Sequence, residues 1–282
     1  MVVIEQTAEL KTLLVGHRAK NRSIGFVPTM GALHDGHLSL VQNALSSSDV
    51  VVVSIFINPT QFDNEDDLFK YPKNLAKDID LLQSIDENII VFKPSKDSIY
   101  DGEVVSKTYN FNGLEKVMEG AFRTGHFNGV ATIVELLLNA VSPDRAFFGE
   151  KDFQQLQIIK KLVALKKIPC EIVGCPIARE ANGLARSSRN ERLSPEIRQK
   201  AGFIYETLKT AKIKFGTESV LEIKDWISKT FTNAADFDLE YFEIADTDTL
   251  TPAQKIQVNR TYRAFVAVYS EQVRLIDNIA LN

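Results

Sequence analysis

Two histidines, His34 and His37, lie three residues apart with Gly36 between them. A neutral imidazole can donate a hydrogen bond to a phosphate oxygen and remain uncharged until negative charge builds up. Gly31 and Gly36 have no side chains, so the backbone can approach a ligand closely. The N–H groups at the start of the following helix favour an anion as that ligand. Paired histidines can also bind zinc, but no nearby cysteine or His-Glu-x-x-His pattern completes a ligand set. Taken alone, the motif fits a nucleotide site or a purely structural turn.

Two later segments supply positive charge. Lys151 stands between an expected strand end and an expected helix start, a position from which an ammonium can reach a phosphate. The alternative is a helix capped by Asp152 with Lys151 in solvent. Residues 179–190 combine three arginines, two serines and a glycine turn, which suits a triphosphate. Composition alone favours an interdomain linker for this segment.

Amide side chains follow the second expected strand. Asn58 and Gln61 come just after the strand of residues 50–53 and its continuation to residue 57, and ligands of open parallel sheets bind beyond the carboxyl ends of the strands. The alternative is an Asn-Pro turn whose amides cap backbone groups.

The acidic residues 63–67 predict an exposed loop rather than a metal site, and Asp78 is expected to be a solvated carboxylate on a helix surface.

A second candidate anion site is the loop of residues 119–129. Glycines punctuate this loop, which carries Arg123 and His126 just before a strongly apolar segment, residues 130–141. A basic loop at a helix start can bind an anion, although a lone arginine is usually only a surface charge.

The elements that must position these residues alternate along the first part of the chain. Apolar runs predict strands, and apolar residues at helical spacing predict helices. The expected strands are residues 24–27, 50–53, 89–92, 108–111, 145–148 and 170–175, and the expected helices are residues 5–20, 38–45, 73–85, 130–141 and 152–166. Such alternation indicates an α/β fold with a Rossmann-like parallel sheet.

The alternation ends near Ala178. Helices are expected at residues 194–213 and 220–231, followed by strands at 236–245, 262–270 and 272–276. The sequence therefore predicts two domains, residues 1–177 with the parallel sheet and residues 178–282 as a smaller α+β domain.

Length and composition fit a globular protein. The 282 residues are 44% hydrophobic and 25% charged, with a net charge of −4, which argues against a general nucleic-acid binder. Cys170 and Cys175 are the only cysteines and are expected to be buried free thiols. No signal peptide or membrane-spanning run is expected, so the predicted location is cytoplasmic.

Four motifs together are more specific than any one alone. They are PTMGALHxGH at residues 28–37, NPxQF at 58–62, GEKDxQQ at 149–155 and SSRN at 187–190. Their order and spacing resemble the pantothenate synthetase (pantoate–β-alanine ligase) family, and the resemblance covers essentially the whole chain. It implies ATP-dependent, AMP-forming condensation of (R)-pantoate with β-alanine through a pantoyl adenylate, with Mg²⁺. It also implies a C-terminal lid domain and a homodimer.

The resemblance also implies roles for particular residues. The implied catalytic residues are His34, His37, Lys151 and Arg189. ATP is expected to contact these four together with Met30, Gly149, Asp152, Ala178, Ser187 and Ser188. Pantoate is expected to contact Asn58, Gln61, Arg123 and Gln155. Asp78 is where the family places an acidic residue near the metal.

One residue departs from the family pattern. Arg186 stands where the family usually has methionine before Ser-Ser-Arg, so an extra cation is expected beside the triphosphate.

Two rival functions are a nucleotidylyltransferase that stops after transferring AMP or CMP, and a catalytically inactive nucleotide-binding scaffold. The Asn58 and Gln61 amides and the long C-terminal half argue against the first, and His34, His37 and Lys151 argue against the second.

Overall fold

The computed structural model describes residues 1–61, 68–69, 71–100 and 102–282. The acidic stretch expected to form an exposed loop, residues 63–67, lies outside the described residues. The chain divides into two compact units. The first comprises Met1–Glu115, Glu119–Glu150 and Gln155–Pro176, and the second comprises Lys116–Met118, Lys151–Gln154 and Ile177–Asn282.

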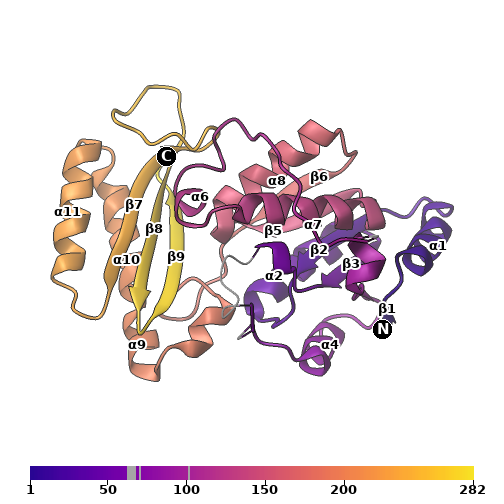
Figure 1. Ribbon diagram of the computed structural model, residues 1–282. Helices are drawn as coiled ribbons and strands as arrows, with labels where there is room; N and C mark the ends of the chain where they lie inside the picture. The colour runs from indigo at the N-terminus through magenta and orange to yellow at the C-terminus, as the bar shows by residue number, and fades with distance from the viewer. Residues whose placement is uncertain (62–67, 70, 101) are drawn as a thin grey trace. The chain divides into compact units, whose positions relative to one another are not determined.

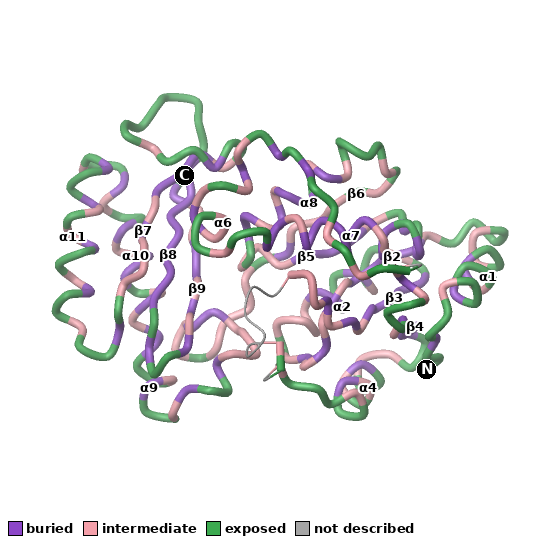
Figure 2. The backbone as a smooth tube through the Cα atoms, in the orientation of Figure 1, coloured by how far each residue is buried: buried purple, intermediate pink, exposed green. Residues whose placement is uncertain are grey.

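The first unit is built on a six-stranded sheet in the order β1-β4-β3-β2-β5-β6, with every neighbouring pair parallel (Figure 1). Its central strands are mostly apolar, as expected for strands covered on both faces. Val50 to Val53 are all buried, for example (Figure 2). The strands are β1 Val2–Ile4, β2 Ile24–Thr29, β3 Val50–Ile55, β4 Ile90–Phe92, β5 Arg145–Gly149 and β6 Glu171–Cys175.

Helices connect these parallel strands. They are α1 Thr7–Arg18, α2 Asp35–Ser47, α4 Leu75–Gln83, α5 Lys96–Tyr100, α6 Glu119–Phe122, α7 His126–Val141 and α8 Phe153–Lys166, with short 3-10 turns at η1 Pro59–Gln61 and η2 Glu150–Asp152. Helix α7 is the most buried of them, as its apolar sequence predicts. None of the helices in the described ranges combines the length and apolarity needed to cross a membrane.

The strand order reverses at one place in this sheet. From β2 the chain proceeds outward to β3 and β4 on one side, and β5 and β6 extend the sheet on the other side. In open α/β sheets, ligands bind beyond the carboxyl ends of the strands at this switch point. The loop after β2 and the residues after β5 therefore mark the expected ligand edge.

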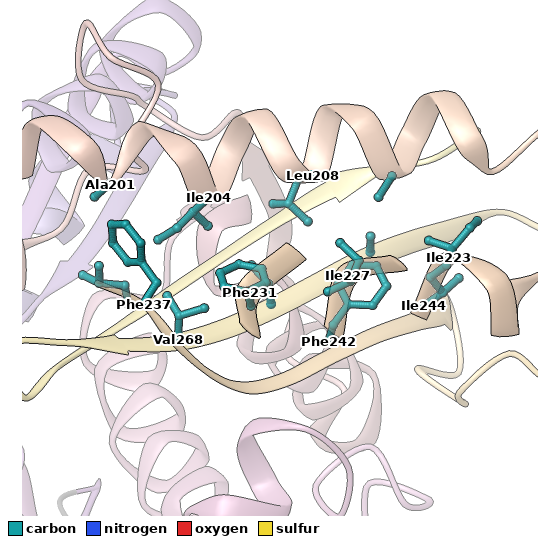
Figure 3. Close-up of a cluster of buried hydrophobic side chains, with 14 of the residues drawn as sticks. Ala201, Ile204, Leu208, Ile223, Ile227, Phe231, Phe237, Phe242, Ile244 and Val268 are labelled. Carbon is teal, nitrogen blue, oxygen red and sulfur yellow. The ribbon is translucent and has the colours of Figure 1, made fainter. Parts of the chain in front are cut away.

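The second unit has its own core. Strands β7 Asp238–Asp246, β8 Tyr262–Ser270 and β9 Val273–Ala280 form an antiparallel sheet, which packs with helices α9 Pro195–Lys200, α10 Gly202–Lys214 and α11 Val220–Thr232. Figure 3 shows side chains from α10, α11 and the strands meeting in one apolar layer. The predicted fold class, a Rossmann-like parallel sheet with a smaller α+β domain, is confirmed.

The observed elements differ from the predicted ones at several places. Residues 108–111 form no strand, because the backbone N–H groups of Lys107 and Tyr109 bond to side chains of α7 rather than to a neighbouring strand. The expected helix at 194–213 is divided into α9 and α10 at Ala201. Strand β1 was not predicted, since its three residues are too few to show a pattern.

The core of the second unit gives a stability prediction. Ile227 on α11 is 1% exposed in this core, so Ile227→Ala should lower the free energy of unfolding by about 2–5 kcal/mol. Trp226 is the only tryptophan and packs against the same core, so its fluorescence in a urea titration reports on this unit. The matched control is Ile213→Ala, because Ile213 on α10 is 77% exposed. Equal losses in the two variants would contradict the assignment of this core.

Candidate active site

The loop between β2 and α2 carries the paired histidines. His34 is the N-cap of α2, and its Nδ1 accepts a hydrogen bond from the Gly36 N–H at 3.1 Å. A neutral His34 therefore carries its proton on Nε2, as a donor. His37 follows in the first helical turn, with its ring centroid 4.1 Å from that of His34. Both imidazoles thus lie at the positive end of the α2 dipole, where an anion is stabilised.

A buried carboxylate holds the start of this loop. Asp78, in the first turn of α4, accepts the N–H of Ala32 at 3.0 Å and the N–H of Leu33 at 2.7 Å, one on each oxygen. Gly31 and Ala32 both have positive φ, at 80° and 50°, a conformation that costs energy for alanine. Burial raises the pKa of the Asp78 carboxyl, and the two N–H groups partly oppose that effect. Asp78 is 2% exposed, so the expectation of a solvated surface carboxylate was wrong.

The amides that follow β3 form a second group. Asn58 is 1% exposed and lies beside Gln61, with Asn58 Nδ2 donating to Gln61 Oε1 at 3.3 Å. Gln61 Nε2 in turn donates to the sulfur of Met30 at 2.9 Å. This contact links the amide turn to the end of the β2 strand. Both amides therefore lie beyond the carboxyl ends of the strands, as the sequence predicted.

The backbone of Gln61 is held by residues around the start of α7. Its carbonyl oxygen lies 2.8 Å from His126 Nδ1 and 3.4 Å from a nitrogen of Arg123, whose other terminal nitrogen lies 3.2 Å from His126 Nε2. A carbonyl only accepts and a guanidinium only donates, so His126 is neutral with its proton on Nδ1. Arg123 and His126 were predicted as an anion-binding loop. In the structure both contact the amide turn.

Lys151 belongs to the second unit. It follows β5, in the turn η2 before α8, as the sequence predicted. Its backbone carbonyl accepts a hydrogen bond from Asn278 Nδ2 of β9 at 2.8 Å. Its ammonium lies 3.9 Å from the Asp152 carboxylate, a contact too long for a strong hydrogen bond. The position of this lysine is therefore tied to β9.

Residues 178–192 are folded and do not form an extended linker. The Arg186 N–H donates to the Ala178 carbonyl at 2.9 Å, and Arg179 bridges to Ala185, so the segment folds back on itself. The turn η3 Ser188–Arg192 follows, capped by the Ser187 hydroxyl, which accepts the Arg189 N–H at 3.2 Å. Composition had favoured an interdomain linker for residues 179–190.

Arg186 is engaged within its own unit. It lies 3.2 Å from Glu180 and 2.8 Å from Glu191, and Arg198 pairs with the same two carboxylates. Burial opposes ionisation of Glu180, but hydrogen bonds from Arg198 and Asn190 outweigh it and lower its pKa. Both glutamates therefore remain charged, and they balance the two arginines. The expected extra cation is substantially neutralised by this network.

The predicted residues thus gather within each unit. In the first unit Gln61 contacts Met30, Asn58 and Arg123, and the rings of His34 and His37 lie beside each other at an interplanar angle of 33°. Gly149 ends β5 beside the switch point, and the half-buried Gln155 lies in the first turn of α8. The second unit holds the remaining predicted ATP contacts, which are Lys151, Asp152, Ala178, Ser187, Ser188 and Arg189.

Sequence reasoning missed the Tyr100 hydroxyl, which donates to Asn58 Oδ1. The two residues are 42 positions apart, and nothing in the local sequence marks their contact.

The described residues include no group of three or more His, Cys, Asp or Glu side chains that could hold a metal ion. Both oxygens of Asp78 already accept backbone N–H groups, so a metal there would compete with the bonds that hold the histidine loop. Asp78 thus serves the loop backbone in this conformation. Its metal role stays a prediction.

Comparisons with known proteins decide the family. The family model for pantoate-beta-alanine ligase matches residues 2–280. The chain belongs to the pantoate–β-alanine ligase family. Its function is accordingly pantothenate synthesis, and this decides against both the nucleotidylyltransferase and the scaffold alternatives.

Relatives of this ligase family match along nearly their whole lengths. The chain is 58% identical over 265 residues to a pantothenate synthetase of Christiangramia forsetii, covering 94% of each chain. It is 51% identical over 281 residues to the pantothenate synthetase of Flavobacterium psychrophilum, covering 100% of each. The crystal structure of pantothenate synthetase from Thermus thermophilus matches with a TM-score of 0.89 at 38% identity, covering 100% of this chain and 99% of that one.

A second solved structure carries ligands. It is the pantoate-beta-alanine ligase from Francisella tularensis complexed with beta-gamma ATP and beta-alanine. It matches with a TM-score of 0.80 at 36% identity, covering 100% of this chain and 98% of that one.

The contacts of Asp78 give a prediction for the histidine loop. In Asp78→Asn, the amide nitrogen cannot accept a hydrogen bond, so one of the two loop N–H groups loses its partner. We expect a stability loss of about 1–3 kcal/mol and a decrease in pantothenate formation of up to about 10²-fold through misplacement of the histidines. Thermal unfolding and steady-state rates measure the two effects. Asp80→Asn, on the exposed face of the same helix, is the matched control, and equal behaviour of the two variants would refute the role.

Proposed function

We propose that this ligase activates pantoate with ATP and then transfers the pantoyl group to β-alanine, releasing AMP and diphosphate. The observation that carries the proposal is the pair of imidazoles at the N-terminus of α2, on the carboxyl edge of a parallel sheet. Family membership and the ATP and β-alanine complex of the Francisella tularensis relative support it.

In the first step, a pantoate carboxylate oxygen attacks the α-phosphorus of ATP, and diphosphate leaves. Negative charge builds up on the equatorial phosphate oxygens during the attack. Donors placed for that charge lower the barrier more than they strengthen ATP binding. We assign this role to His34, His37, Lys151 and Arg189, and we assign further nucleotide contacts to Met30, Gly149, Asp152, Ala178, Ser187 and Ser188.

We assign pantoate to the amide group beyond β3. Amides can donate to a carboxylate and also donate to or accept from hydroxyls, and pantoate carries both kinds of group. Gln61 is the principal contact in this assignment, with Gln155, Asn58 and Arg123 contributing to the site. The contact of Gln61 with Met30, at the end of β2, supports a pantoate carboxylate close to the nucleotide loop.

In the second step, the β-alanine amine attacks the acyl carbon of the adenylate, and AMP leaves with the C–O bond electrons. No general base is assigned: an amine that binds in its neutral form attacks directly, and the proton that it loses as the amide forms passes to the leaving AMP phosphate or to solvent. Excluding water is more important, since hydrolysis would waste the adenylate. The resemblance to the family supports a lid role for residues 178–282 in this exclusion.

Three further features complete the proposal. Mg²⁺ would accompany ATP on its phosphates and neutralise part of their charge, which is its usual manner of binding in nucleotide sites. A homodimer follows from the family resemblance. A cytoplasmic location is supported by the two free cysteines, Cys170 and Cys175, which suit a reducing compartment.

The assigned phosphate donors can be tested by substitution. His37→Ala and Lys151→Ala should each slow pantoyl adenylate formation by about 10²–10³-fold, because each removes a donor to developing charge. Rapid-quench single-turnover measurements isolate this step. His17→Ala on α1 and Lys160→Ala on the exposed face of α8 are matched controls and should keep the normal rate. Near-normal rates for the first pair would refute the assignment.

The order of the two steps can be tested by omitting substrates. With ATP and pantoate alone, one enzyme equivalent of diphosphate should form in a burst, and the adenylate should remain bound. Adding β-alanine should then release AMP and pantothenate. Diphosphate release that required β-alanine from the outset would contradict an adenylate formed first.

A further inference from the structure

Tyr100 places a hydroxyl group inside the first unit. It ends helix α5, and its OH donates to Asn58 Oδ1 at 2.5 Å and lies 3.3 Å from the Thr60 hydroxyl. Its ring packs against Phe56, with centroids 6.3 Å apart. Burial raises the pKa of the Tyr100 hydroxyl above its ordinary value, so the group stays protonated and can donate at neutral pH.

The amide of Asn58 has no remaining hydrogen-bonding capacity. Its oxygen accepts from the hydroxyls of Tyr100 and Thr60, the latter at 3.1 Å. Its nitrogen donates to the Gly129 carbonyl at 3.2 Å and to Gln61 Oε1 at 3.3 Å. An amide has two donors and two lone pairs, and all four are used here. Asn58 is also 1% exposed, so binding a substrate would require breaking one of these bonds.

These partners fix which way the amide faces. The Gly129 carbonyl can only accept, so the Asn58 nitrogen must point to it and the oxygen must point to Tyr100. The second N–H of Asn58 is then directed at the oxygen of Gln61. Gln61 therefore presents its own oxygen to Asn58 and its nitrogen toward Met30.

The main chain at Gln61 is held in place by its neighbours. Helix α7 approaches the turn so closely at Gly129 that a Cβ there would lie 2.1 Å from the Thr60 carbonyl oxygen and 2.8 Å from the Gln61 nitrogen. His126 and Arg123 hold the Gln61 carbonyl from the same side. With the main chain fixed, the conformation of the Gln61 side chain is the remaining variable, and Asn58 restricts it.

We propose that Tyr100 is a positioning residue for pantoate binding, acting through Asn58 to orient the Gln61 amide. In this arrangement Asn58 transmits the constraint and does not itself contact pantoate. The inference rests on the proposed function, which assigns pantoate to Gln61. It adds Tyr100 to the site and changes the role of Asn58.

The test is the substitution Tyr100→Phe, which removes only the hydroxyl. We expect KM for pantoate to rise about fivefold to tenfold, the effect of losing one hydrogen bond. KM for ATP and kcat at saturating pantoate should stay within about twofold, since Gln61 would still reach the bound conformation. Initial rates of AMP formation, with each substrate varied in turn, give these constants.

Two further variants isolate the cause. Tyr109→Phe is the matched control, because the Tyr109 hydroxyl also makes a buried hydrogen bond in the same unit, but to Glu135, at 2.6 Å, and not to Asn58. It should leave KM for pantoate unchanged. Thr60→Val removes the other hydroxyl bonded to Asn58 and should raise the same KM, and it serves as the test if Tyr100→Phe does not fold.

Gln61→Ala separates the inference from the proposed function. If Gln61→Ala raises KM for pantoate and Tyr100→Phe does not, the positioning role is wrong while the substrate assignment holds. If Gln61→Ala has no effect on this KM, both are wrong. A lower melting temperature in Tyr100→Phe with an unchanged KM for pantoate shows a merely structural tyrosine and also overturns the inference.

Discussion

In the loop that follows β2, the backbone N–H groups no longer pair with a neighbouring strand, so they need other hydrogen-bond acceptors. This requirement shapes the site in the first unit. Side chains supply those acceptors in succession. The Thr29 hydroxyl accepts from Gly31, Asp78 accepts from the next two residues, and His34 accepts from Gly36. Because these four N–H groups find acceptors within the protein, the loop is held in shape by its own contacts.

The same requirement explains why several polar side chains near the site form hydrogen bonds that hold the loops in place. Asn58 and Asp78 both lie at the predicted ligand edge, and both are almost fully buried with their polar atoms engaged. Their residue types suggest substrate or metal contacts, whereas their contacts show that they organise the turns carrying Gln61 and His34. The residues to which we assign ligand binding are then held in place by residues with structural roles, an arrangement that would limit reorganisation on binding.

Much of the fold was predictable because it depends on local patterns. The apolar runs of β2 and β3 and the helical spacing in α2 and α11 were recognisable from sequence, as was the loss of alternation after β6. Residues 108–111 were mistaken for a strand because an extended apolar segment bonded to helix side chains has the same pattern as a paired strand. Within the site, motif residues were found, but the Tyr100 contact and the burial of Asp78 were not. Both depend on chain segments brought together only by folding.

The arginines of residues 179–190 show how folding changes the meaning of composition. Arg179 pairs with Asp277, and Arg186 pairs with two glutamates, so two of the three positive charges in the segment are compensated inside their own unit. An anion near this segment would therefore meet directed donor groups more than a general positive field. A polyanion of the wrong shape, such as a nucleic-acid strand, therefore gains little by approaching this segment.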